Sequence, residues 1–177
     1  MKRYVPIIIG LVALGGVLYV GNKEMSKGDD EVVVEGTSTE ITSKSFQGKV
    51  VRMFEGENTL EYGMDLPATA TATISMDGAL VKVADQDTPV LAMYVSYEGG
   101  RGYSPSDYIT NNIITKVKGV TMVGTTTIGG YNWDVAESEG SVWHVAKTAD
   151  NNWLLVVENK KDANDKATPI IESIVTK

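Results

Sequence analysis

A strand-rich segment covers residues 122–158 and reads MVGTTTIGGYNWDVAESEGSVWHVAKTADNNWLLVVE. Strands are predicted at 122–127, 132–137, 142–148 and 153–158, in short runs rich in β-branched and aromatic residues. The runs are separated by Gly129-Gly130, Ser138-Glu139-Gly140 and residues 149–152, all of hairpin length. The segment therefore predicts an antiparallel meander.

Three tryptophans, Trp133, Trp143 and Trp153, fall ten residues apart in this meander. The spacing is compatible with an internal repeat. Hairpin-linked strands of similar length produce the same spacing, and this is the simpler interpretation.

The half of the chain before the meander also predicts strands, at residues 49–54, 59–64, 69–76, 79–84 and 90–97. Asp77-Gly78 is a favourable pair for the tight turn between the third and fourth of them. A glycine-rich loop at 98–102 ends this half.

A helix is predicted between Ser104 and Gly119. Ser104 is a good N-cap, Asp107 completes a capping-box arrangement and Pro105 fits the first helical position. One helix face is apolar, because an apolar residue recurs every four positions, at Ile109, Ile113 and Val117.

A second helix is predicted from about Thr168, with Pro169 in its first turn. Its buried residues would be Ile170, Ile171, Ile174 and Val175. The order strands, helix, meander, helix indicates an α+β fold in which two helices pack on one antiparallel sheet.

The N-terminal segment 4–20 reads YVPIIIGLVALGGVLYV and carries no charge. At a rise of about 1.5 Å per residue it is just long enough for a transmembrane helix. Lys2 and Arg3 precede it, so the positive-inside rule places the N-terminus in the cytoplasm and the rest outside. A cleaved signal peptide is the alternative, with Ala13-Leu14-Gly15 as its best cleavage site. Both interpretations export the domain.

The predicted organisation has three parts: a transmembrane anchor or signal peptide at 1–21, a flexible polar tether at 22–45, and an extracytoplasmic α+β domain at 46–177. Within the tether, Val32-Val33-Val34 is either a short strand that pairs with the domain edge or an isolated apolar patch. A tether of this composition behaves as a flexible coil.

Composition excludes several functions. The chain has no cysteine, which removes disulfides, thiolate metal sites and cysteine nucleophiles and is typical of many bacterial envelope proteins. Setting aside Lys2 and Arg3, the exposed part has 14 basic and 23 acidic residues, a formal charge of −9. Nucleic acid is therefore not expected as a partner, because its binding depends on concentrated Lys and Arg.

The order of elements, together with the aromatic stretch Leu60-Glu61-Tyr62-Gly63-Met64-Asp65-Leu66-Pro67 and the Gly-turn hairpin after it, resembles the PsbP-like family over about residues 46–177. The resemblance implies an antiparallel sheet between helices in an exported domain. It transfers no functional residue to this chain.

His144 is the only histidine, and a strand histidine that is hydrogen-bonded or solvated is the expected reading. No Gly-x-Ser-x-Gly elbow accompanies it. The acidic residues pair in predicted turns, where solvated surface charge is expected, although Asp and Asn loops can also bind calcium. These positions are Asp85 and Asp87, Glu137 and Glu139, Asp162 and Asp165, and 150–152. We predict no metal site, no cofactor and no catalytic residue.

The glycine-rich loop before the first helix is the best candidate for a contact surface. Arg101, Tyr103 and Tyr108 are the residues that would contact a ligand or partner there, because exposed aromatics with an arginine are frequent anchors. A flexible turn with ordinary packing is the alternative.

The function expected from these features is a membrane-tethered extracytoplasmic binding or assembly module with an envelope or membrane protein partner. The alternatives are an envelope enzyme, either a hydrolase or a metal-dependent activity, and a small-ligand carrier. A cleft with converging carboxylates around His144 would favour the enzyme, whereas an apolar patch at Tyr103 and Tyr108 would favour docking.

Overall fold

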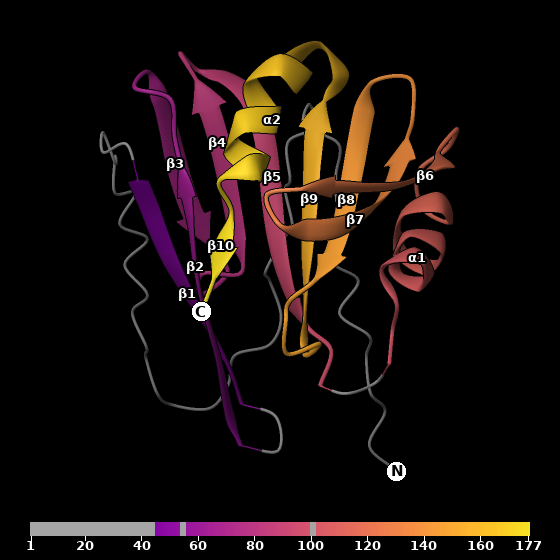
Figure 1. Ribbon diagram of the computed structural model, residues 1–177. Helices are drawn as coiled ribbons and strands as arrows, with labels where there is room; N and C mark the ends of the chain where they lie inside the picture. The colour runs from indigo at the N-terminus through magenta and orange to yellow at the C-terminus, as the bar shows by residue number, and fades with distance from the viewer. Residues whose placement is uncertain (1–44, 54–55, 100–101) are drawn as a thin grey trace, which may run out of the picture.

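Two antiparallel sheets carry the fold (Figure 1). The computed structural model of the protein describes residues 45–53, 56–99 and 102–177. The large sheet has the strand order β3-β4-β5-β9-β8-β7-β6 and the small one the order β1-β2-β10. The large sheet consists of β3 (Ala70–Ser75), β4 (Leu80–Asp85), β5 (Thr88–Tyr97), β6 (Thr121–Ile128), β7 (Tyr131–Glu137), β8 (Ser141–Lys147) and β9 (Trp153–Lys160). The small sheet consists of β1 (Ser45–Met53), β2 (Glu57–Asp65) and β10 (Val175–Thr176).

The predicted strands and the α+β class are confirmed, including the meander of β6 to β9. The prediction of a single sheet is wrong. After β2 the chain turns at Pro67, whose carbonyl accepts a bond from the Ala70 amide at 2.9 Å, and β3 starts the other sheet. The C-terminal β10 then pairs with β2. Pairing between segments so far apart in sequence leaves no local signal.

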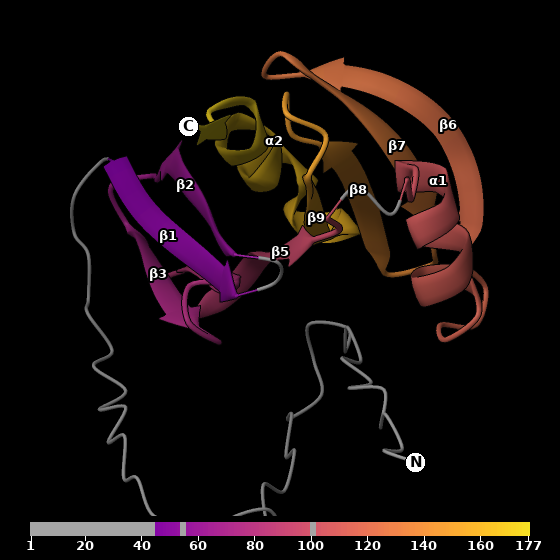
Figure 2. The same ribbon diagram turned by 90° about the horizontal axis from the view of Figure 1, so that it is seen from below.

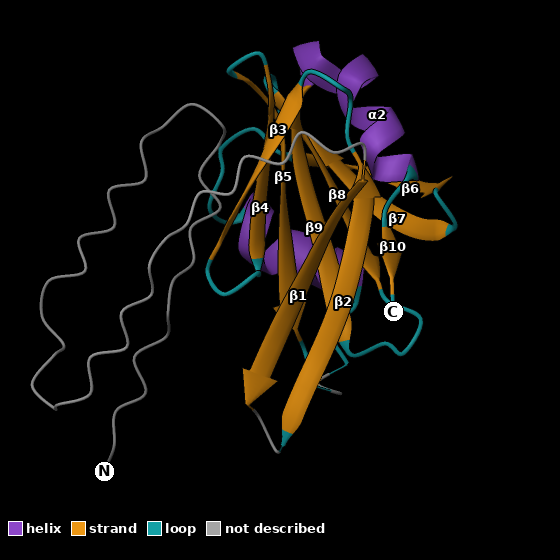
Figure 3. Cartoon of the chain, turned by 90° about the vertical axis from the view of Figure 1, so that its left-hand side faces the viewer, coloured by secondary structure: helices purple, strands orange, loops and turns teal. Residues whose placement is uncertain are grey.

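The large sheet is covered on both faces, and successive residues of β9 show the division. Leu155 and Val157 point to a core shared with the small sheet and α2 (Asn164–Glu172), whereas Leu154 and Val156 point to a second core beneath α1 (Pro105–Tyr108). We call these the α2 face and the α1 face. Figure 3 shows the β1–β2 pair lying across the β3 end of the large sheet on the α2 face.

The tryptophans are distributed over both faces. Trp133 and Trp153 belong to the core of the α2 face, and Trp143 belongs to the core of the α1 face. Their equal spacing therefore reflects hairpins of similar length, as the simpler interpretation held, and the three side chains are not structurally equivalent.

The first helix begins as predicted but does not continue as an α-helix. The Ser104 hydroxyl accepts a bond from the Asp107 amide at 3.1 Å, and an Asp107 carboxylate oxygen accepts one from the Ser104 amide at 3.2 Å, which completes the capping box. From Ile109 the backbone widens into a π-helix, η1 (Ile109–Ile114). Ile109 and Ile113 are buried as predicted, on the α1 face.

The second helix starts earlier than predicted. A short 3₁₀ turn, η2 (Lys161–Ala163), leads into α2 at Asn164, so Pro169 lies inside the helix and not in its first turn. Ile170, Ile171 and Ile174 are buried as predicted, but Val175 is 54% exposed because it lies in β10. The proline removes one intrahelical donor, a cost that the buried packing of Ile170 and Ile171 offsets.

No helix in the described part of the chain is long and apolar enough to cross a membrane. The predicted anchor at 1–21, the tether up to residue 44 and Val32-Val33-Val34 lie outside the described residues.

Candidate functional site

A cleft of about 560 Å³ opens on the α2 face at the β6 end of the large sheet. Strand β6 forms one wall through residues 123–126 and Ile128. Val142 and His144 of β8 contribute to the floor, and the far wall comes from Lys161, Asn164 and Thr168. Figure 1 shows how the wall arises: β6 and β7 cross in front of β8 and β9 beside α2. Figure 2 shows the curvature of β6 that makes this crossing possible.

Strand register places His144 on the cleft floor. His144 lies opposite Val135 on one side and Val157 on the other, so its side chain shares their α2 face. Its ring makes an edge-to-face contact with Trp133, with centroids 6.2 Å apart and planes at 88°. This contact stabilises the ring orientation within the floor.

The imidazole of His144 is buried, and no hydrogen bond of ordinary geometry reaches it from the described residues. Only 7% of the residue is exposed, and neither Nδ1 nor Nε2 has a partner among the described residues. Burial lowers the pKa of His144 below its ordinary value of 6.5, and the nearby Asn159 amide and Glu137 carboxylate oppose that shift only partly. The ring is therefore predominantly neutral at pH 7, with one nitrogen as a donor and the other as an acceptor.

Asn159 adds a second unused polar atom beside the histidine. Its side chain is fully buried, and Nδ2 donates to the Lys160 carbonyl at 3.1 Å and to Asn164 Oδ1 at 3.2 Å. Its Oδ1 has no partner in the described part of the chain. Buried polar atoms are almost always paired in native proteins, so a cluster of unpaired ones at a cleft indicates a site for a ligand or ordered water.

An ion pair crosses the rim of the cleft. Lys161 Nζ lies 2.7 Å from Glu137 Oε2, and both side chains are partly exposed. Because these are the only charged residues lining the cleft within the described residues, the lining has no net charge at pH 7. Strongly charged ligands therefore gain little from it.

Contacts near the β6–β7 turn hold the hairpin against the C-terminal end of the chain. A side chain on Gly129 would meet the Glu172 carbonyl at 2.5 Å, so the turn and the end of α2 are in close contact. The hydroxyl of Tyr131 is bonded to that of Thr176 at 2.8 Å. These contacts hold the hairpin, and with it the β6 wall, in place.

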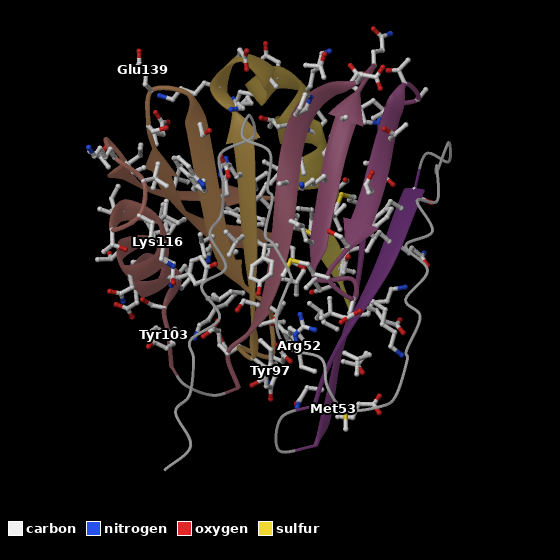
Figure 4. The ribbon with its side chains drawn as sticks, turned by 180° about the vertical axis from the view of Figure 1, so that it is seen from behind. Arg52, Met53, Tyr97, Tyr103, Lys116 and Glu139 are labelled. Carbon is white, nitrogen blue, oxygen red and sulfur yellow. The ribbon has the colours of Figure 1, made fainter. Side chains whose placement is uncertain are left out.

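The predicted contact residues lie elsewhere. Tyr103 is 43% exposed, whereas Tyr108 packs against the core of the α1 face and burial raises its pKa. Arg101 lies outside the described residues. Figure 4, seen from behind, shows Tyr103 and Lys116 on this side of the molecule. A contact role for Arg101, Tyr103 and Tyr108 stays a prediction.

Of the acidic residues in the predicted turns, Asp85 and Glu137 are half-buried and the others are exposed, as expected of surface charge. Asp85 accepts bonds from Thr69 and from Lys166, both at 2.6 Å, which lower the pKa of its carboxyl. Asp150 accepts bonds from Thr148 and from Asn152 within its own turn. Across the described residues, no group of three or more His, Asp or Glu could hold a metal ion.

A second hollow, of about 360 Å³, lies on the small sheet beside β10. Its charged side chains, Lys49, Glu61 and Lys177, are exposed. The Tyr62 hydroxyl is already bonded to the Gly78 carbonyl at 2.6 Å. None of its described lining residues has an unpaired buried polar atom, so this hollow is a weaker candidate for a binding site.

Comparison with known proteins leaves the family open. No protein-family model matches the chain, and no curated protein matches it. A crystal structure from Bacteroides thetaiotaomicron VPI-5482, at 1.50 Å resolution, is similar over 66% of this chain and 45% of its own, with 11% identity and a TM-score of 0.44. The matched region is thus less than half of that chain, and a likeness at this level carries no inference about function. The resemblance to the PsbP-like family stays a prediction.

Proposed function

We propose that the chain is a membrane-tethered extracytoplasmic binding or assembly module, and that the cleft above His144 is its binding site. The observation that supports the cleft is the group of buried polar atoms at its floor: the ring nitrogens of His144, which lines the cleft, and Oδ1 of Asn159, which lies beneath the lining. None of these atoms has a partner among the described residues. A bound partner would supply those hydrogen bonds and recover the cost of burying them.

The binding function has better support than the enzyme alternative. A histidine that acts as a general base is usually oriented by a hydrogen bond to its second ring nitrogen. His144 has no such bond among the described residues, and Glu137, the cleft carboxylate, is paired with Lys161. The converging carboxylates that would favour a hydrolase are therefore not found around His144 in the described part of the chain.

Site-specific photocrosslinking tests the binding site in the full-length chain. A photoreactive amino acid is placed at Val123 on the cleft wall, at Tyr103 on the other side, or at Met53, which is 79% exposed at the end of β1. We expect one discrete envelope-protein product from Val123 and none from Met53. A product from Tyr103 alone would move the binding site to the predicted contact loop, and equal products at all three positions would contradict a specific site.

Membrane fractionation tests the tether. With a tag at Lys177, the full-length chain should stay in the membrane fraction after an alkaline carbonate wash. Protease added to spheroplasts should remove the tag. Release into the soluble fraction would contradict a retained anchor, and protection of the tag would contradict the orientation.

A further inference from the structure

The outer edge of β6 is not paired with any other described strand. β6 ends the large sheet, and within the described residues it pairs with β7 alone. Gly129 and Gly130 have φ values of +58° and +83°, which is the two-residue turn of a type I′ hairpin. In such a hairpin the flanking pair, Ile128 and Tyr131, is hydrogen-bonded, and bonded and non-bonded pairs then alternate.

This alternation identifies the outward backbone groups. Thr126 pairs with Trp133 through backbone bonds, so the N–H and C=O groups of Thr125 and Thr127 point away from β7. A bulge follows between Met122 and Gly124, which leaves Val123 without an opposite residue. Residues 123–126 also line the cleft, so part of the outward edge borders it.

Apart from its bulge, the edge of β6 has none of the usual protection against pairing. Natural edge strands carry charges, prolines or bulges, or are very short. The eight residues of β6, TMVGTTTI, include neither a charge nor a proline, and Met122 and Val123 are 41% and 59% exposed. By comparison, β1 carries Lys49 and Arg52, and β10 has two residues.

We propose that the partner of the cleft is an uncharged, extended peptide segment of another protein, which adds to the outer edge of β6 as an antiparallel strand. This inference rests on the proposed binding function of the cleft. Backbone groups of Thr125 and Thr127 bind the peptide backbone, as in other cases of strand addition. Side chains of the peptide that point inward reach the floor at His144. The neutral lining, with Lys161 already paired to Glu137, favours a segment without charge.

Amide hydrogen exchange of the full-length chain in detergent tests this pairing. The probe is a capped peptide of alternating Thr and Val, as long as β6. We expect the peptide to slow exchange at the outward amides of Thr125 and Thr127, whereas Gly124 and Thr126, already paired with β7, change little. A peptide in which Lys replaces every Val is the control and should protect none of them.

Proline substitution gives an independent readout. Thr125→Pro removes one outward N–H at a position where an edge strand tolerates proline, and we expect peptide affinity to fall about tenfold. Thr125→Val is the matched control: it also loses the 3.1 Å bond to Asp134 but keeps the N–H, and it should bind like the unmodified chain. Equal affinity of the two variants would overturn strand addition. If Thr125→Pro does not fold, the pattern of amide exchange in the unmodified chain is the test of strand addition.

The outcomes separate the two proposals. Suppose that the peptide changes the NMR chemical shifts of the His144 ring but gives no alternating protection of β6. That result would overturn strand addition and leave the cleft as a binding site. Alternating protection that appears without peptide as protein concentration rises would make a second copy of this chain the occupant, and the peptide proposal would fail. If the peptide changes neither exchange nor the His144 signals, strand addition by an uncharged peptide is overturned. If Val123 also gives no crosslink, the binding site is overturned as well.

Discussion

His144 and Asn159 carry an energetic cost that ordinary core residues do not. Each has a buried polar atom without a partner in the described part of the chain, and such an atom costs about 1–3 kcal/mol of folding free energy. An apolar floor would be more stable. Retaining these polar groups beside a cleft is typical of binding sites, where stability is given up for recognition.

The histidine makes stability depend on pH in a definite window. Its pKa is lower in the folded protein than the ordinary 6.5, so the unfolded chain binds the proton more readily. Its contribution is therefore present above about pH 6.5 and is lost as pH falls toward the lower folded pKa. We expect the free energy of unfolding to drop between pH 7 and pH 5, and to drop less in His144→Phe, as measured by urea denaturation.

Thr168→Val is the control for this experiment, because it alters the cleft wall without removing a titrating group. It should keep the pH dependence of the unmodified chain. Asp85, Asp107 and Asp150 also have lowered pKa values, but stability linked to them is lost only as pH falls below their ordinary value of 3.8. An identical slope in His144→Phe and the unmodified chain would contradict the burial of a neutral imidazole.

The β6–β7 turn provides a matched pair of glycine substitutions. Both glycines have positive φ, so alanine costs about 1–2 kcal/mol at either position. At Gly129 the added carbon would also lie 2.5 Å from the Glu172 carbonyl, whereas at Gly130 it meets nothing within 4 Å. Thermal denaturation should therefore show a larger loss for Gly129→Ala than for Gly130→Ala. Equal losses would mean that the turn does not contact the end of α2.

At the level of elements, the helix on the α1 face depends on its first turn. α1 and η1 together are short, and isolated helices of this length are marginal in water. The capping box at Ser104 and the burial of Ile109 and Ile113 compensate for that. The apolar spacing could not predict the change to a π-helix at Ile109. A spacing of four residues between Ile109 and Ile113 places both on one face in an α-helix and in a π-helix alike.

Removing the N-cap should destabilise the protein measurably. Ser104→Ala leaves the Asp107 amide without its acceptor, and the loss should be about 1 kcal/mol in chemical denaturation. Thr110→Ala is a suitable control, since its exposed hydroxyl bonds only to the Ser106 carbonyl within the same turn. A loss at Thr110 as large as that at Ser104 would show that the cap is not what stabilises this end.

For the whole molecule, the large sheet links two cores. β9 contributes Leu155 and Val157 to the core of the α2 face, and Leu154 and Val156 to the core of the α1 face. A defect in either core therefore acts on the same strands. Domains of this size usually unfold in one cooperative step, and the shared sheet gives a physical reason for it here.

Core truncations on the two faces test this coupling. Ile113→Ala on the α1 face and Ile171→Ala on the α2 face should each cost about 2–5 kcal/mol, because both side chains are 1% exposed. Both variants should lower a single transition seen alike by tryptophan fluorescence and circular dichroism. Ile74→Ala, at a 40% exposed position, is the control with a small effect. Separate transitions for the two probes would show that the faces fold independently.

Local sequence was sufficient for the strands, the hairpin turns and the capping box at Ser104, because each depends on residues within a few positions of one another. It also predicted the α+β class. Packing in three dimensions was needed for the second sheet, for the faces on which Trp133 and Trp143 lie, and for the burial of His144. The cleft also depends on packing in three dimensions, because β6, β8 and α2 are far apart along the chain. The curvature of the sheet brings the uncharged edge of β6 beside the unpaired polar atoms.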